Sequence, residues 1–272
     1  MQAAMTFYAT VPAGDERTFM PDVPYLFPAS SFARPRYKMR APRLPDHVTD
    51  LAADCGGYVA TVRWGEYRYS PAEYVAWLDS WKVKPVWAAT MDFCCEQDIA
   101  TDKAEVMLRQ DKTTDMAYHF WEEYRDCPWA WVPTIQGWNV DDYIRHANEL
   151  KPLVYEMRDH YTDGWRVGIG TLCQRADGRM IRDVVMAVTS VFPDVPIHLW
   201  GVKLGAFQGK EGLPEQVCSM DSAAWNGLFG KNRERWRASG LPQREWSYKV
   251  ALPEYLQKID NLKRQRKQLR LF

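Results

Sequence analysis

Short polar sequences follow several apolar, strand-like runs of this chain, and this arrangement restricts the folds that it can adopt. The polar signatures begin at Asp54, Asp92, Gln136, Gly168, Trp200 and Ser219. In a barrel of alternating strands and helices, the carboxyl ends of all strands open at one mouth, so residues far apart in the sequence can build one pocket there. Three of the six signatures carry an aspartate, which predicts a pocket lined by carboxylates.

Strand-like and helix-like segments alternate along the chain. Strands are predicted over residues 5–10, 51–53, 83–91, 129–135, 166–172, 196–202 and 216–220. Ser70, Pro71 and Glu73 form a helix-start pattern, and that helix is predicted to reach residue 81. Further helices are predicted over 99–126 with an interruption at 112–115, over 139–160, over 177–191 and over 253–271.

This alternation indicates parallel β-α units, in either a closed barrel or an open doubly wound sheet. An open sheet concentrates its site near one switch point, whereas the signatures here fall on six different strand ends. They therefore favour a (β/α)8 TIM-type barrel, and a length of 272 residues suits one such domain spanning residues 1–272.

Composition narrows the class of protein. The chain is 46% hydrophobic and holds 13 tryptophans, which is too apolar for a disordered chain. It has no run approaching the roughly 20 apolar residues of a membrane span and no export signal at its start. We expect a cytoplasmic protein without membrane contact. The six cysteines and five histidines have no zinc-like spacing, so we expect reduced thiols and no metal.

A net charge of zero conceals a basic C-terminal segment. Residues 231–272 hold 12 Lys/Arg against 4 Asp/Glu, whereas residues 1–230 carry the compensating negative charge. A second basic run consists of Arg34, Arg36, Lys38, Arg40 and Arg43. Both could hold a phosphate backbone through Coulomb attraction and counterion release. A solvated protein surface is the alternative interpretation.

Several signatures together resemble a known family over residues 5–226. They are Phe7-Tyr8, Asp54-Cys55-Gly56-Gly57-Tyr58, Gln136-Gly137-Trp138, Gly168-Ile169-Gly170-Thr171-Leu172-Cys173, Gly201-Val202-Lys203 and Ser219-Met220-Asp221-Ser222-Ala223-Ala224-Trp225. In this order they resemble the tRNA-guanine transglycosylase superfamily, and most closely its DNA-directed branch from phages and bacterial DNA-modification islands. The resemblance implies a (β/α)8 barrel and a ping-pong exchange of guanine in DNA for a 7-deazaguanine without a cofactor. The expected incoming base is 7-cyano-7-deazaguanine (preQ0).

The resemblance also implies roles for individual residues. Asp221 corresponds to the nucleophile and Asp54 to the general acid/base. Asp92 and Gln136 correspond to residues that bind the edge of the base, with backbone groups of Gly170 nearby. The remaining substrate-binding candidates are two aromatic residues that would sandwich the base and three further residues of the signatures: Tyr58, Trp200, Gly201, Cys94 and Lys203. The implied partners are DNA and the free base; a helper protein that opens the duplex is left open, and no oligomeric state is predicted.

The chemistry supports two carboxylates with separate tasks. Breaking the bond between deoxyribose and guanine creates oxocarbenium-like charge at C1′, which an ionised carboxylate can trap before a second base displaces it. A second carboxyl group must move a proton to the departing base and from the arriving one. The target nucleotide must also leave its stack to reach the mouth of a barrel.

Structural alternatives exist for each candidate. An aspartate after a strand is often a helix N-cap, and Tyr58 and Trp200 could be core aromatics. Cys94 could be an inert buried thiol and Lys203 a surface lysine, while Glu96 and Arg175 could border the pocket. The broader family has a zinc-binding cysteine cluster after the last strand that this chain lacks. We expect Trp225, Trp236 and Trp246 to hold the C-terminal segment in its place. An enzyme acting on tRNA and a non-catalytic barrel that binds nucleic acid or a free deazapurine are the alternative functions.

Overall fold

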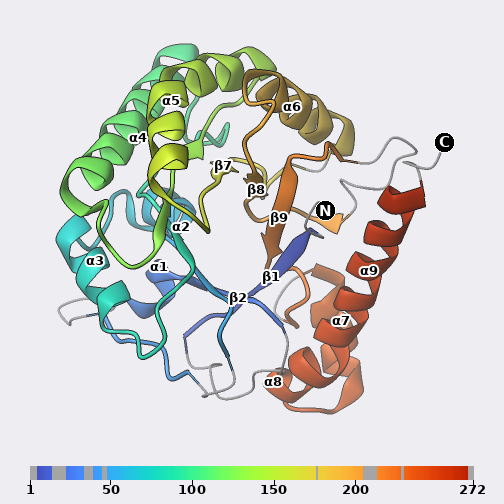
Figure 1. Cartoon of the computed structure of the whole chain (residues 1–272). Coiled ribbons are helices and arrows are strands. Elements are labelled where there is room, and N and C mark those ends of the chain that lie inside the picture. Colours follow the sequence, from blue (N-terminus) through green and yellow to red (C-terminus); the bar gives the residue numbers. More distant parts are fainter. Residues whose placement is uncertain are drawn as a thin grey trace.

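Nine parallel strands form the centre of the computed structural model, which describes residues 5–13, 23–33, 39–44, 48–175, 177–204, 213–227 and 230–268 (Figure 1). Their order in the sheet is β5-β4-β3-β2-β1-β9-β8-β7-β6. The strands are β1 (Thr6–Thr10), β2 (Tyr25–Pro28), β3 (Leu51–Asp54), β4 (Trp87–Ala89), β5 (Ala130–Val132), β6 (Thr134–Ile135), β7 (Val167–Ile169), β8 (Ile197–Leu199) and β9 (Val217–Ser222).

The sheet curls into a nearly closed barrel because its two end strands are neighbours in the sequence. Only Pro133 separates β5 from β6, and proline cannot donate a ladder hydrogen bond. The carbonyl of Pro133 still accepts from the Gly168 amide at 2.8 Å, so the chain keeps its place beside β7. Together β5 and β6 fill one of eight positions around the barrel, which confirms the predicted TIM-type fold in a single domain.

Helices surround the strands (Figure 1). They are α1 (Ala29–Phe32), α2 (Gly57–Val59), η1 (Ala60–Trp64), α3 (Pro71–Asp79), α4 (Lys103–Tyr124), α5 (Val140–His160), α6 (Gly178–Val191), α7 (Gly230–Ser239), α8 (Gln243–Trp246), η3 (Ser247–Ala251) and α9 (Leu252–Gln268). None of the described helices combines the length and the apolarity needed to cross a bilayer.

Local sequence explains where the main helices begin. Ser70 accepts from the Glu73 amide at 3.2 Å, and Glu73 accepts from the Ser70 amide at 2.8 Å, which is the capping box predicted for α3. The predicted interruption at residues 112–115 is wrong, since α4 runs through them. There the Thr113 hydroxyl donates to the Arg109 carbonyl within the helix, and Thr113 and Thr114 are buried, so packing outweighs their low helix propensity.

Two apolar layers stabilise the barrel. The larger core lies between the strands and the helices, and it includes stacked aromatic rings of α3 such as Tyr74 and Trp77. The smaller core fills the interior of the barrel with one residue from each of several strands, among them Tyr8, Leu26 and Trp87. Trp87 Nε1 donates to the Tyr8 hydroxyl at 3.0 Å, so this inner core contains satisfied polar groups beneath the mouth.

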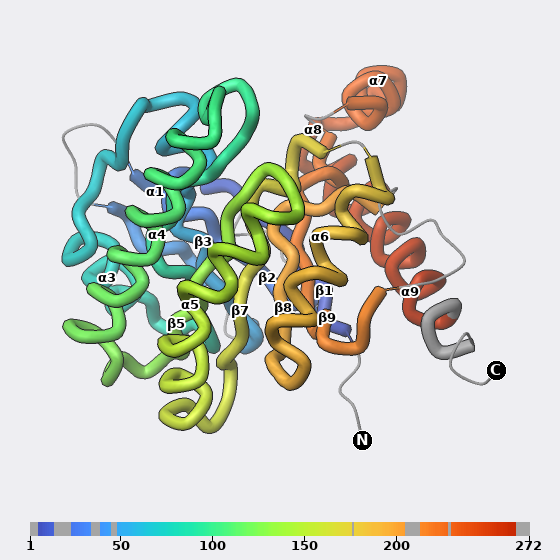
Figure 2. Tube along the Cα trace, turned by 90° about the horizontal axis from the view of Figure 1, so that it is seen from above, coloured from blue at the N-terminus to red at the C-terminus, as the bar shows by residue number. Residues whose placement is uncertain are grey.

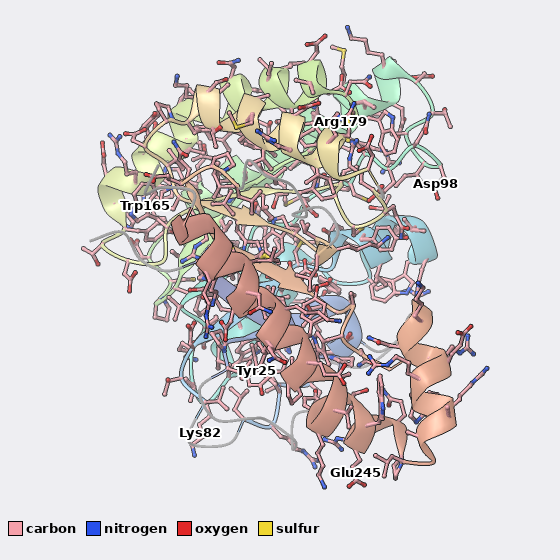
Figure 3. The ribbon with its side chains drawn as sticks, turned by 90° about the vertical axis from the view of Figure 1, so that its right-hand side faces the viewer. Tyr25, Lys82, Asp98, Trp165, Arg179 and Glu245 are labelled. Carbon is pink, nitrogen blue, oxygen red and sulfur yellow. The ribbon has the colours of Figure 1, made fainter. Side chains whose placement is uncertain are left out.

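The C-terminal segment packs against the barrel beside β1 and β9. Trp225 and Trp246 are buried, Trp236 is partly buried, and the Trp225 ring lies 5.1 Å from that of Tyr248. The Ser247 hydroxyl accepts from the Gly227 amide at 3.0 Å. Figure 2 shows α7 at the edge of the molecule, and Figure 3 shows α9 crossing its face. Aromatic packing thus joins this segment to the end of β9.

Candidate active site

A cavity of about 1000 Å³ opens at the carboxyl ends of the strands. All ten residues predicted for the site line it: Asp54, Tyr58, Asp92, Cys94, Gln136, Gly170, Trp200, Gly201, Lys203 and Asp221. Its volume matches that of typical small-molecule sites, which reach about 1000 Å³. The structure therefore places Asp54 of β3 and Asp221 of β9 on one cavity, although they lie far apart in the sequence. Glu96 and Arg175 are buried, and of these two Glu96 lines the cavity.

Asp221 receives hydrogen bonds at both carboxylate oxygens. The Thr10 hydroxyl donates to Oδ2 at 2.7 Å, and the Gly201 amide donates to Oδ1 at 2.8 Å. Gly201 has a φ of 63°, a left-handed conformation that favours glycine, and a Cβ there would approach Cys173 to 2.9 Å. These two donors fix the orientation of the carboxylate.

A chain of buried polar groups continues behind Asp221. His198 Nε2 lies 3.3 Å from Asp221 Oδ1, and its Nδ1 lies 2.9 Å from the Ser219 hydroxyl, which accepts from Arg166 Nη1 at 2.8 Å. Burial lowers the pKa of His198, so the imidazole is neutral. All of these hydrogen bonds can form when the Ser219 hydroxyl donates to Nδ1 and the protonated Nε2 donates to Asp221. The network therefore assigns the proton of the neutral imidazole to Nε2.

Asp54 has a different environment from Asp221. Its Oδ1 accepts from the Gly56 amide at 2.9 Å, and burial raises its pKa to about 7, with smaller contributions from the charges of Asp92 and Asp221. A carboxyl group with a pKa near 7 can both donate and accept a proton at neutral pH. The cavity therefore holds two acidic groups whose surroundings suit different tasks.

Asp92 and Gln136 are joined to one another on the cavity wall. Gln136 Nε2 donates to Asp92 Oδ2 at 2.7 Å, and the Cys55 thiol donates to Asp92 Oδ1 at 3.3 Å. The Thr171 hydroxyl donates to Gln136 Oε1 at 2.6 Å. Burial raises the pKa of Asp92, whereas the hydrogen bonds from Cys55 and Gln136 lower it in part. Both side chains are held in place and could exchange these bonds for bonds to a flat base.

The backbone groups of Gly170 were expected to face the base, but they bond to other parts of the protein. Its amide donates to the Ile135 carbonyl at 2.9 Å, and its carbonyl accepts from the Tyr143 hydroxyl at 2.9 Å. A Cβ at this position would lie only 2.4 Å from Gln136 Nε2. The absence of a side chain therefore leaves the room that Gln136 occupies.

The other predicted residues form the walls and the rim. Tyr58 and Trp200 are both half-buried; the Tyr58 hydroxyl accepts from Gln174 Nε2 at 2.7 Å, and the Trp200 ring lies 4.4 Å from that of His198. Burial raises the pKa of Cys94 to about 12, so its thiol stays protonated and is a poor nucleophile. Lys203 is exposed at the rim. Arg34, Arg36 and Lys38 lie outside the described residues, and neither Arg40 nor Arg43 lines the cavity.

Residues at this site that the sequence did not indicate include Thr10, His198, Tyr255 and Lys258. His198 is buried and stands between Ile197 and Leu199 in β8. Alternation therefore points it to the side opposite these two apolar residues, into the barrel. Thr10 ends the first predicted strand, which a closed barrel places next to the last one. Tyr255 and Lys258 of α9 carry no signal in the sequence that would link them to the mouth.

A comparison with known protein families matches most of the chain. The family model described as DpdA, DeoxyPurine in DNA protein A, matches residues 24–236. The matched range includes all ten predicted site residues, from Asp54 in β3 to Asp221 in β9. No curated protein matches the chain.

Proposed function

This chain belongs to the DpdA family of DNA-modifying transglycosylases, and on that premise we propose that it exchanges guanine in DNA for a 7-deazaguanine base. We propose preQ0 as the incoming base and a glycosyl-Asp221 ester as the intermediate. The observation that carries this proposal is the presence of Asp221 and Asp54 on one cavity, in environments that suit a nucleophile and a proton carrier.

In the first step, a carboxylate oxygen of Asp221 forms a bond to C1′ while the bond from C1′ to N9 of guanine breaks. The electron pair of that bond leaves with guanine, which takes a proton from Asp54. The hydrogen bonds from Thr10 and Gly201 hold the attacking carboxylate in place. An oxocarbenium-like transition state is stabilised by the adjacent negative charge.

In the second step, N9 of the 7-deazaguanine attacks C1′ from the face that guanine left. The ester bond to Asp221 breaks, its electron pair returns to the carboxylate, and Asp54 accepts the proton from N9. One glycosidic bond replaces another, so the exchange balances without a further reactant. Two displacements retain the configuration at C1′.

Base selection follows from the paired acceptors on the cavity wall. A guanine-like base presents N1–H and an exocyclic amine side by side, and the Asp92 carboxylate can accept from both. The Gln136 amide can donate to the adjacent oxygen of the base. Because the cavity lies at the mouth of the barrel, the target nucleotide must be extruded from its stack, which costs a few kcal/mol.

The test is covalent trapping. Wild-type protein, Asp221→Asn and the control Asp98→Asn are incubated with single-stranded DNA and then denatured; Asp98 is exposed and does not line the cavity. We expect an adduct with wild type and Asp98→Asn and none with Asp221→Asn. Labelled preQ0 in nucleosides from the DNA, and not from a parallel tRNA incubation, would confirm the substrate. Incorporation by Asp221→Asn equal to that of wild type would overturn the assignment.

A further inference from the structure

Two lysines of the C-terminal helices border the cavity. Lys231 lies in the first turn of α7 and Lys258 lies in α9, and both are exposed residues that line the cavity. No salt bridge links either lysine to another residue of the described part of the chain. Their ammonium groups are therefore available to a ligand at the mouth.

An ion pair links the two helices α7 and α9. Arg235 Nη2 lies 3.0 Å and 2.8 Å from the two carboxylate oxygens of Glu254, and the Arg235 guanidinium lies 5.4 Å from the centre of the Trp246 ring. Arg235 follows Lys231 by four residues, and Lys258 follows Glu254 by four. Residues four apart share one face of a helix, so each lysine lies one turn from the ion pair, on the side that reaches the cavity.

Tyr255 anchors α9 beside the proposed nucleophile. Its ring lies 5.3 Å from that of Phe7 in β1, and the side chain is only 8% exposed. Burial raises the pKa of Tyr255 to about 12, and the nearby charge of Asp221 contributes to that rise. One turn of α9 therefore separates Lys258 from a residue that is close to Asp221. Figure 3 shows α9 across the front of the molecule with α7 beside its lower end.

Acidic and basic side chains lie at different depths of the cavity. The carboxylates of Asp92, Glu96 and Asp221 are buried, whereas the lysines stand exposed at the rim. A phosphate group would be repelled from the interior and attracted to the rim, and a neutral base has no such preference. Nucleic acid that inserts one base would thus leave its phosphates beside the lysines.

We propose that Lys231 and Lys258 bind the phosphodiester backbone of the DNA strand next to the target nucleotide. This inference rests on the proposed function, because it takes the occupant of the cavity to be a nucleotide of DNA. Lys258 lies beyond residue 236, where the match to the family model ends, so this part of the surface comes from the chain's own C-terminal helices.

The test measures binding without turnover. Fluorescently labelled single-stranded DNA that contains guanine is titrated with the full-length protein at several salt concentrations. The variants are Lys231→Ala, Lys258→Ala and both together; the matched control is Lys249→Ala, an exposed lysine of η3 that pairs with Glu245 at 2.7 Å and does not line the cavity. Circular dichroism and thermal melts show that each variant is folded.

Each lost phosphate contact on a single strand should reduce the slope of log K against log salt by about 0.7, so we expect about 1.4 for the double variant. The Lys249→Ala slope should equal that of wild type. Equal slopes for the double variant and wild type would overturn the proposal, and so would an equal change in Lys249→Ala, which would indicate net charge alone. DNA binding that follows these expectations without any base exchange would instead contradict the proposed function and leave the phosphate contacts standing.

Discussion

Nε2 of His198 lies 3.3 Å from Oδ1 of Asp221, and both side chains are buried. His198 does not line the cavity, so it acts through Asp221 as a positioning residue. We expect His198→Phe to slow formation of the covalent adduct by about ten- to a hundredfold, because a hydrogen bond to a charged group contributes about 1.5–3 kcal/mol. The measurement is the single-turnover rate of adduct formation beside the Kd for DNA, which should not change.

A conservative variant separates positioning from loss of packing. His198→Gln keeps an N–H donor and should recover part of the rate, whereas His198→Phe should not. Ser219→Ala should give a smaller effect, since the direct contact between His198 and Asp221 remains when the hydroxyl beside Nδ1 is removed. Wild-type rates of adduct formation in His198→Phe would contradict the role assigned to this contact.

The raised pKa of Asp54 predicts how stability depends on pH. The folded pKa of about 7 lies above the usual value, so between about pH 4 and pH 7 the folded protein binds more protons at this site than the unfolded chain. Stability from this site is therefore lost as pH rises through that window. Asp54→Asn removes this titrating group and should raise the free energy of unfolding above pH 7 by about 2 kcal/mol. This is roughly half of the free energy that the full pKa shift implies, because Asp54 is only partly buried and solvent screens its charge.

Thermal or urea unfolding of wild type and Asp54→Asn at pH 4.5 and pH 7.5 tests this. The difference between the two proteins should grow from the lower to the higher pH. A constant difference would mean that the carboxyl group titrates normally. The same variant should lose the proton transfer assigned to Asp54, so base exchange should fall even though the fold gains stability.

The barrel and the cavity lining could be predicted because they depend on patterns that are local in the sequence. Apolar runs that end in Asp54, Asp92 or Asp221 identify strand ends, and the closure of a barrel then brings those ends together. Strand lengths could not be predicted in the same way. The run over 83–91 forms only β4 (Trp87–Ala89), because pairing with β3 and β5 decides which residues join the ladder.

Contacts made in three dimensions were beyond the sequence. Position 170 requires glycine because a side chain there would collide with Gln136. That requirement becomes visible only when the distance between the two residues is known. Lys258 reaches the cavity because α9 packs on β1 and β9 through Tyr255, which no periodicity indicates. The helix α7 also escaped prediction, since none of its described residues is buried and its sequence has no apolar face.

The close approach at Gly170 yields a prediction about base recognition. A Cβ there would lie 2.4 Å from Gln136 Nε2, so Gly170→Ala must displace the end of the Gln136 side chain. We expect KM for the free base to rise about tenfold or more, since one or two hydrogen bonds to the base are lost, with little change in kcat for the base that does bind. Steady-state kinetics with labelled base measure both. An unchanged KM would show that Gln136 does not contact the base.

The ion pair between α7 and α9 should matter more for DNA binding than for stability. Arg235 and Glu254 are 46% and 42% exposed, so their pairing contributes at most about 1 kcal/mol to the free energy of unfolding. Arg235→Ala should therefore lower Tm only slightly, yet release α7, which has no buried residue among those described, and so misplace Lys231. We expect weaker binding of single-stranded DNA in Arg235→Ala and in Glu254→Ala. The double variant should bind no more weakly than either single one, because both remove the same link. If the losses of binding free energy of the two single variants instead added up in the double variant, Arg235 would contact the DNA directly through its own charge.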